Sequence, residues 1–416
     1  MTQKRKFYHI IYLSLVLFFL TNVESASLPA DNQPEEVVQQ YFSQWQTIQH
    51  DTQLSKEEKG EKLITLLNGL LDIERISQHL LPNDWNKIHT YQHERFKKAL
   101  SISLKNEITS SAMIGNGDSP LFLQLKNKKI TSDNSATLDF RLSGNNKVLD
   151  IRLFMNRDNN EKWQVSNIQV GKKISLTRHY YQYCKKLLDN YSLSYLIAEL
   201  GNYNYVVLED FEEGTAGAFP PHWRWKSKDD NKRKPYVIRV EDHNHYLEAT
   251  DEGESVIIGK SIKWNLKKYR YVSFRWRVHR IPPGGDERYG KTVDSAAGIY
   301  FIYKKKMGLI PESVKYVWSS TLPVGSAMRR SGVGKPWMVV ADSGTDHLGE
   351  WRTYVFDAYQ AYKDTFGGEP PETAIGIGIL SDANSTHSQA YADYDDIRAV
   401  KEAKADSGVK KILQAE

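Results

Sequence analysis

The sequence has very little cysteine. Only one of its 416 residues is a cysteine, Cys184, so no disulfide can form within the chain. Stability must then come from hydrophobic cores, and a chain of this length suggests two domains of ordinary size. Cys184 lies among tyrosines on the apolar side of an expected helix, which indicates a buried, unreactive thiol rather than a nucleophile.

The sequence also has little excess of charge of either sign. The formal net charge is +5. Removal of an N-terminal leader with Lys4, Arg5, Lys6 and Glu24 would take away three positive charges and one negative charge, leaving +3. A chain so close to charge balance gives no indication of a nucleic-acid partner.

Long apolar runs are missing beyond the first residues. Three basic residues, Lys4 to Lys6, precede a short apolar core from Ile10 to Leu20, and small residues follow. This pattern predicts a signal peptide over residues 1–25 that is cleaved after Ser25. The alternative is an uncleaved anchor, but a bilayer-spanning helix needs about 20 apolar residues. We therefore expect an exported, soluble protein.

Signatures of catalysis are also missing. The chain has no His-Glu-x-x-His metal motif, no glycine-rich phosphate loop before a helix and no Gly-x-Ser-x-Gly elbow. We accordingly expect no catalytic residues, no metal and no cofactor, and a protein that is not an enzyme.

The first half combines helices with strands. Apolar residues recur at helical spacing from Pro34 to about Ile108, and residues from Leu176 to Leu200 predict one or two more helices. Between them lie four segments of alternating polarity, which predict strands: PLFLQLKNK, SATLDFRLS, KVLDIRLFM and KWQVSNIQV. The expected domain, residues 35–203, is α+β, with helices packed on a four-stranded antiparallel sheet.

The second half is dominated by strand patterns. Turn residues separate them at intervals typical of a β-sandwich, which predicts a jelly-roll-like all-β domain over residues 204–401. One short helix is expected around Ala358 to Phe366, and residues 402–416 read as a loose tail. Gly376 and Gly378 fall on one strand face, which indicates close approach of another backbone or of a ligand.

Residues 163–192 join a strand to a helix rich in aromatic residues. Tyr180, Tyr181 and Tyr183 would suit the wall of an apolar pocket. From the residues alone, however, such an aromatic stripe is more typical of an ordinary core.

Two stretches carry a family resemblance. LLDIERISQHLLPNDWNKIHTYQHERFKKAL and WQVSNIQVGKKISLTRHYYQYCKKLL resemble the MlaC, or toluene-tolerance, family of periplasmic phospholipid-binding proteins. The matching positions are Asp72, Ile76, Ser77, Trp85, Gln92, Phe96, Trp163, Val165, Ser175 and Leu176. Two features depart from the family pattern: Asn167 stands where an aspartate is usual, and residues 171–174 are longer than the usual step before Ser175.

The resemblance implies a cavity that holds acyl chains and leaves the headgroup in solvent. It also implies a periplasmic location, and as partners a phospholipid, an inner-membrane Mla-type ABC transporter and an outer-membrane lipoprotein complex that maintain outer-membrane lipid asymmetry. The expected cavity-lining residues are Leu67, Leu71, Ile76, Trp85, Phe96, Leu100, Phe140, Ile151, Leu153, Val165, Leu176, Tyr180 and Tyr181.

Polar loops of the second half form another candidate site. Its residues are Asp286, Arg288, Asp294, Trp351, Asp382 and Asn384. Such loops could hold Ca²⁺, which takes about six to eight oxygen ligands, could bind sugar hydroxyls beside aromatic rings, or could simply be solvated turns. The stretches LGEWRTYVFDAYQAYKDTFGGEPP and IGIGILSDANST resemble the family called domain of unknown function 3047, which implies no activity. One carboxylate is missing at each of two places, near Asp294 and Asp382, where that family usually has an additional one.

Two hypotheses follow. The first is a phospholipid-binding and transfer protein that acts through the first domain. The alternative is a periplasmic glycan-binding or glycan-processing protein that acts through the β-sandwich, which paired carboxylates at a catalytic separation would favour.

Overall fold

The computed structural model describes residues 33–110, 122–144, 147–158, 160–171 and 174–402. The expected signal peptide and nearly all of the expected tail lie outside these residues. By internal packing the described residues divide into two compact units: those up to 189 together with 199–202, and residues 190–198 together with those from 203 onward. The segment Asn190–Ala198 thus packs with the second unit, although the sequence predicts the boundary near residue 203.

The first unit begins with helices. They are α1 (Pro34–His50), α2 (Lys56–Leu70), α3 (Ile73–Leu80), the short 3₁₀ helix η3 (Trp85–Lys87) and α4 (Thr90–Ser110). Local chemistry explains where α2 starts. Ser55 Oγ accepts a hydrogen bond from the backbone N–H of Glu58 at 3.2 Å, and the Glu58 carboxylate accepts one from the Ser55 N–H at 2.8 Å. This reciprocal capping satisfies two backbone donors at the helix end.

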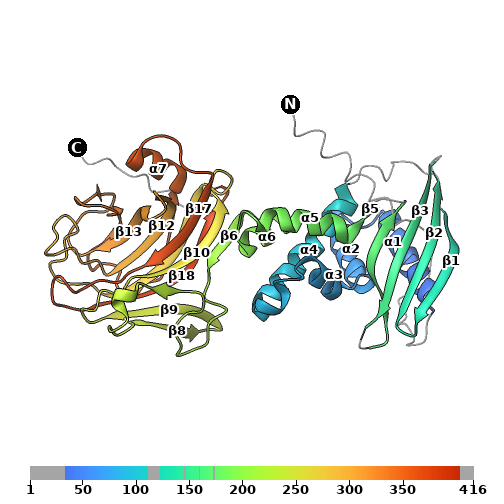
Figure 1. Cartoon of the computed structure of the whole chain (residues 1–416), viewed down its shortest axis with the longest axis horizontal. Coiled ribbons are helices and arrows are strands. Elements are labelled where there is room, and N and C mark those ends of the chain that lie inside the picture. Colours follow the sequence, from blue (N-terminus) through green and yellow to red (C-terminus); the bar gives the residue numbers. More distant parts are fainter. Residues whose placement is uncertain (1–32, 111–121, 145–146, 159, 172–173, 403–416) are drawn as a thin grey trace. The chain divides into compact units, whose positions relative to one another are not determined.

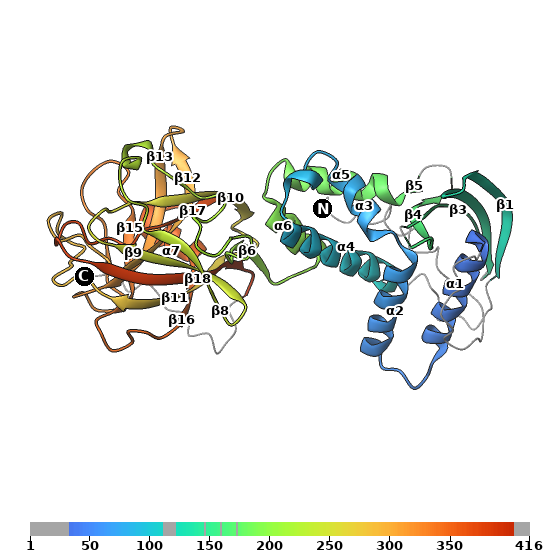
Figure 2. The same cartoon turned by 90° about the horizontal axis from the view of Figure 1, so that it is seen from below.

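An antiparallel sheet and helix α5 complete the first unit. The strands are β1 (Phe122–Ser132), β2 (Ser135–Gly144), β3 (Lys147–Arg157), β4 (Trp163–Val170) and the two-residue β5 (Ile174–Ser175), hydrogen-bonded in that order. Helix α5 (Leu176–Leu188) follows directly. The helices lie against one face of this curved sheet (Figures 1 and 2). The predicted α+β architecture is therefore confirmed, with β5 as a short addition.

Helix α6 (Leu193–Leu200) and β6 (Tyr205–Glu209) lead into the second unit. The seven-stranded sheet of this unit has the order β14-β15-β13-β12-β17-β10-β7, and the other sheet has the order β16-β11-β18-β9-β8 with β6 paired to β18. Among the described strands, β13 and β15 form a parallel pair. The bounds are β7 (Arg224–Trp225), β8 (Tyr236–Glu241), β9 (Asn244–Asp251), β10 (Ile258–Asn265), β11 (Tyr271–Arg280), β12 (Ala297–Lys306), β13 (Ile310–Ser319), β14 (Ala327–Met328), β15 (Trp337–Ser343), β16 (Arg352–Asp357), β17 (Thr373–Ile379) and β18 (Ala390–Val400).

Aromatic rings from the two sheets meet between them. Phe274 of β11 packs against Phe301 of β12, with ring centres 6.1 Å apart, and Tyr316 of β13 stacks on Phe356 of β16 at 4.1 Å. Such rings bury large apolar areas and favour offset or edge-on geometry. This core confirms the β-sandwich prediction. The expected helix around Ala358 to Phe366 is confirmed too, as α7 (Ala358–Phe366), which Asp357 caps by accepting from the Gln360 N–H at 2.9 Å.

Candidate functional site

The first unit contains an apolar cavity between its helices and its sheet. Side chains from α1, α2 and the four long strands line it: Val38, Phe42, Leu70, Leu123, Phe140, Ile151, Leu153, Val165 and Ile168. Every lining residue is hydrophobic, so the cavity offers nothing for catalysis and is suited to alkyl chains.

Strand geometry explains how the sheet contributes. Phe140 lies directly opposite Ile151 in the β2–β3 register, so both side chains point to the same face. In β4, Val165 and Ile168 are three residues apart, yet both reach the cavity, because the pairing of β3 with β4 shifts by one residue there. An extra residue of this kind in a strand redirects the side chains that follow it.

The cavity is narrow. Its empty volume is about 370 Å³ including the open mouth, but the room for water-sized molecules is about 20 Å³. That is enough for about one water. Two acyl chains would therefore enter only if the helices moved away from the sheet.

Most residues expected to line a lipid cavity are buried, but they divide between two places. Phe140, Ile151, Leu153 and Val165 line the cavity. Buried elsewhere in the first unit are Leu67, Leu71, Ile76, Trp85, Phe96, Leu100, Leu176 and Tyr180. Tyr181 differs, because its side chain on α5 is 36% exposed. The sequence reasoning missed Val38, Phe42, Leu70, Leu123 and Ile168, although the helical spacing of Val38 and Phe42 was a usable signal.

The aromatic stripe of α5 packs against α4. The Tyr180 hydroxyl lies 3.1 Å from Ser103 Oγ, and it also hydrogen-bonds the Glu107 carboxyl. Burial raises the pKa of Glu107 to about 7, while that hydrogen bond acts in the opposite direction. Cys184 is buried as expected, and burial raises the pKa of its thiol to about 12. Tyr180 and Cys184 are thus part of a helical core, whereas Tyr181 and Tyr183 are exposed.

A second, polar groove of about 290 Å³ lies beside α3 and the start of α5, and Arg75 and Asn167 are among its lining residues. Asn167 replaces the aspartate that the MlaC resemblance leads one to expect. Its Oδ1 still accepts hydrogen bonds from Ser175 Oγ at 3.3 Å and from the Thr177 N–H at 3.2 Å. The amide oxygen therefore supports the start of α5 as a carboxylate would, without its charge.

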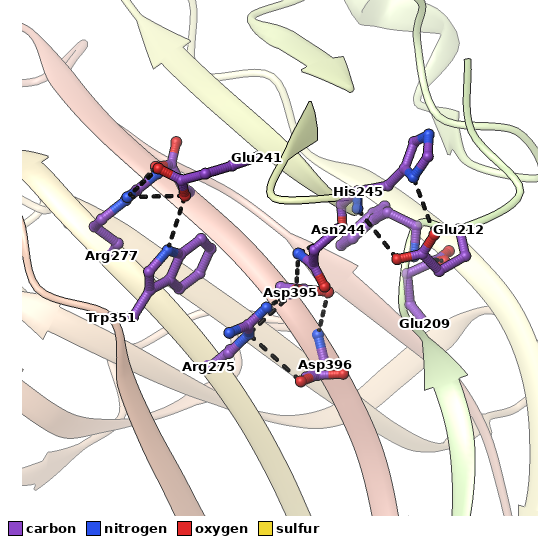
Figure 3. Close-up of polar contacts among 12 residues, drawn as sticks. Glu209, Glu212, Glu241, Asn244, His245, Arg275, Arg277, Trp351, Asp395 and Asp396 are labelled. Carbon is purple, nitrogen blue, oxygen red and sulfur yellow. Dashed lines mark hydrogen bonds and ion pairs between the residues drawn. The ribbon is translucent and has the colours of Figure 1, made fainter. Parts of the chain in front are cut away.

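The polar candidates of the second unit do not form one site. Asp286 pairs with Arg288, their closest atoms being 2.7 Å apart, and Asn384 is exposed. Trp351 lies on the outer face of the sheet that contains β11 and β18, beside Arg275 and Arg277 of β11 (Figure 3). Asp294 and Asp382 are close enough for the charge of Asp294 to act on the pKa of Asp382.

Trp351 lies in a network of ion pairs (Figure 3). Its ring centre is 4.6 Å from the Arg275 guanidinium and 4.7 Å from that of Arg277. Arg275 pairs with Asp395, and Arg277 with Glu241 at 3.2 Å. Each charge has a partner, so the network is suited to stabilising this face rather than to chemistry.

Asp294 lies just before β12, and its side chain holds the loop that follows β17. Its carboxylate accepts hydrogen bonds from the N–H groups of Ser385 at 3.1 Å and Thr386 at 2.6 Å, and from the Thr386 hydroxyl. Asp382 differs, because its Oδ1 is buried with no hydrogen-bond partner within the described part of the chain. Burial raises the pKa of Asp382, and the nearby Lys315 lowers it.

Metal binding and membrane spanning find no support among the described residues. No three His, Cys, Asp or Glu side chains there come together so that they could hold a metal ion. In the same ranges, no helix combines the length and the apolar character needed to cross a bilayer.

Comparison with known proteins adds matches to two families and weak likenesses to solved structures, two of which are described here. None of the curated proteins matches this sequence. A phospholipid-binding protein from Ralstonia solanacearum, solved with a phospholipid, is 14% identical with a TM-score of 0.29, over 34% of this chain and 80% of that one. A mannan-recognising carbohydrate-binding module is 14% identical with a TM-score of 0.20, over 48% of this chain and 99% of that one. At these TM-scores, neither structural likeness supports a conclusion about function.

The family matches divide the chain at nearly the same place as its fold. Residues 221–398 match the family described as protein of unknown function (DUF3047), and residues 35–202 match the family described as MlaC protein. The chain therefore joins a segment that matches the MlaC family, and that contains the apolar cavity, to a β-sandwich segment that matches a family of unknown function.

Proposed function

We propose that the first unit binds the acyl chains of one phospholipid in the cavity between α1, α2 and the sheet. The observation that carries the proposal is the composition of the lining, which has no polar residue. Moving a CH₂ group from water into such surroundings is favourable by about 0.8 kcal/mol. The headgroup, which gains nothing from an apolar wall, stays in solvent.

The match of residues 35–202 to the MlaC family supports the wider role. In this role the protein is exported to the periplasm and carries phospholipid between an inner-membrane Mla-type ABC transporter and an outer-membrane lipoprotein complex. A carrier of this kind needs to bind and release lipid, and it needs no catalytic residue.

The experiment fills the cavity and counts the lipid. Protein purified without detergent is extracted with organic solvent, and phospholipid per chain is measured for the wild type, Leu153→Trp and the surface control Tyr181→Ala. Leu153 lines the cavity and is 6% exposed, whereas Tyr181 lies on the exposed side of α5. We expect about one lipid per chain in the wild type and the control, and a clear loss in Leu153→Trp.

A melting curve is recorded for each variant, because overpacking a core lowers the stability of the fold by about 1–3 kcal/mol. Loss of lipid counts only where the variant is still folded. Val165→Phe, a smaller intrusion into the same cavity, serves as the second variant. Full lipid content in both cavity variants, with melting temperatures near that of the wild type, would refute the assignment.

A further inference from the structure

A group of polar side chains on the outer face of the seven-stranded sheet lacks partners. Lys315 of β13 is 3% exposed, and its ammonium makes no hydrogen bond or ion pair with any residue that the structure describes. Burying a charge in this way is costly unless something compensates it. We call the following four residues the Lys315 cluster: Tyr300, Lys315, Arg330 and Asp382.

The fold holds these side chains in place through glycines. Lys315 lies opposite Tyr300 in the β12–β13 register, with the ammonium 5.4 Å from the Tyr300 ring centre. A Cβ at Gly298 would come within 2.3 Å of Lys315 Cε, and one at Gly378 within 3.4 Å of Tyr300 Cβ. Bare backbone at Gly298 therefore makes room for the Lys315 side chain, whereas the contact at Gly378 is an ordinary van der Waals distance. At Gly376 and Gly378 the nearest atoms to an added Cβ are backbone oxygens, Lys260 O at 2.8 Å and Ile258 O at 3.2 Å, so the predicted close approach of another backbone is confirmed.

Asp382, the hydrogen-bond acceptor of the cluster, is held in place by backbone and side-chain contacts. The Asp382 N–H donates to Ser295 O at 3.0 Å, and the Ser381 hydroxyl next to it lies 2.8 Å from the Tyr394 hydroxyl. The Asp382 carboxylate accepts hydrogen bonds from the Ser255 side chain and from the Asn384 backbone. Its Oδ1 is nevertheless left without a partner, and so is Arg330 Nε. Buried polar atoms in native proteins are nearly always paired, so these two unpaired atoms beside the Lys315 ammonium call for an explanation.

Electrostatics shows that the four groups are near one another. The charges of Asp382 and Arg330 act on the pKa of both Lys315 and Tyr300. Burial lowers the pKa of Lys315, and Asp382 is the largest influence in the opposite direction. The carboxylates of Glu287 and Asp294 also act on Lys315, but both are occupied, Glu287 by the hydroxyls of Ser295 and Ser319.

The orphaned groups define the chemistry of a ligand. Lys315, Arg330 and Tyr300 offer donors, while ionised Asp382 only accepts. A hydroxyl group both donates and accepts, so neighbouring hydroxyls can satisfy both kinds of group. A phosphate or sulfate could satisfy only the donors, and it would have to approach three carboxylates. We propose that the Lys315 cluster is a binding site for a neutral carbohydrate.

The test is calorimetric titration of the full chain with cellohexaose, mannohexaose and xylohexaose, and separately with inorganic phosphate. The cluster variants are Lys315→Met and Asp382→Asn. Their matched controls are Lys305→Met, at an exposed lysine of β12, and Asp346→Asn, at an exposed aspartate. We expect at least one oligosaccharide to bind the wild type. Each cluster variant should lose about tenfold or more in affinity, as when a hydrogen bond to a charged group is lost, and the controls should bind as the wild type does.

Thermal unfolding supplies a reading that does not depend on the choice of sugar. If the cluster exists for a ligand, removing an unpaired charge should leave the melting temperature unchanged or raise it. A marked fall in both cluster variants would mean that the groups stabilise one another and would overturn the proposal. So would binding of phosphate alone, equal sugar affinity in variants and wild type, or no binding of any of the three oligosaccharides at millimolar concentration.

Discussion

At the scale of single residues, the Glu107 carboxyl makes the stability of the first unit depend on pH. Its folded pKa of about 7 lies above the ordinary value of 4.5 because the group is buried. The folded protein therefore keeps this proton up to about pH 7, while the unfolded chain releases it near pH 4.5. It follows that this group makes the fold less stable as pH rises through that window, by up to about 3 kcal/mol.

Glu107→Gln should remove this dependence. We expect the variant and the wild type to be similar in stability near pH 5, and the variant to be more stable near pH 8, as measured by urea unfolding at both pH values. A difference between the two proteins that stays constant with pH would contradict the assignment.

The buried thiol gives a second prediction at this scale. With its pKa raised to about 12 and its side chain in the α5 core, Cys184 should not react with a disulfide reagent at pH 8 in the native protein. It should react at once after unfolding in denaturant. Rapid labelling of the native protein would show that the α4–α5 packing opens readily.

Individual residues also show where sequence reasoning stops. The buried state of Cys184 could be predicted, because it depends on helical spacing alone. The separation of Trp351 from Asp382 could not, because it depends on which sheet each neighbouring loop joins. Lys315 was missed because a lone lysine in a strand pattern reads as a solvent-facing residue, and only the pairing of β12 with β13 places it among buried groups.

At the scale of elements, lipid loading should move α1 and α2. The cavity has room for about one water, so acyl chains can enter only if these helices shift from the sheet. We expect amide hydrogen exchange to differ between lipid-free and loaded protein in α1 and α2, with β2 and β3 unchanged. Identical exchange in the two states, with lipid present at one per chain, would contradict this mechanism.

The elements themselves were largely predictable. Alternation of polar and apolar residues identified β1 to β4, and the apolar spacing of residues 358–366 identified α7. The order of the strands in each sheet could not be predicted from the sequence, because pairs such as β12 with β17 join segments that are far apart in the chain. Cavity lining was only partly predictable, because helical spacing tells which residues are buried and not which of them face a gap.

At the scale of the whole molecule, the segment Asn190–Ala198, which contains most of α6, belongs with the second unit. Ser192 donates to Lys263 O through both its N–H and its hydroxyl, and Tyr195 packs edge-on against Tyr269 with ring centres 5.7 Å apart. A fragment of residues 190–402 should therefore melt clearly higher than one of residues 204–402. Equal melting temperatures would show that α6 adds nothing to the sandwich.

The central claim is that this chain carries a phospholipid in its first unit. Native mass spectrometry of the full chain, purified without detergent, tests it most directly. The account predicts a main species heavier than the protein by the mass of one phospholipid, and loss of that species in Leu153→Trp but not in Tyr181→Ala. Protein that stays free of lipid, both as purified and after incubation with phospholipid vesicles, would contradict it.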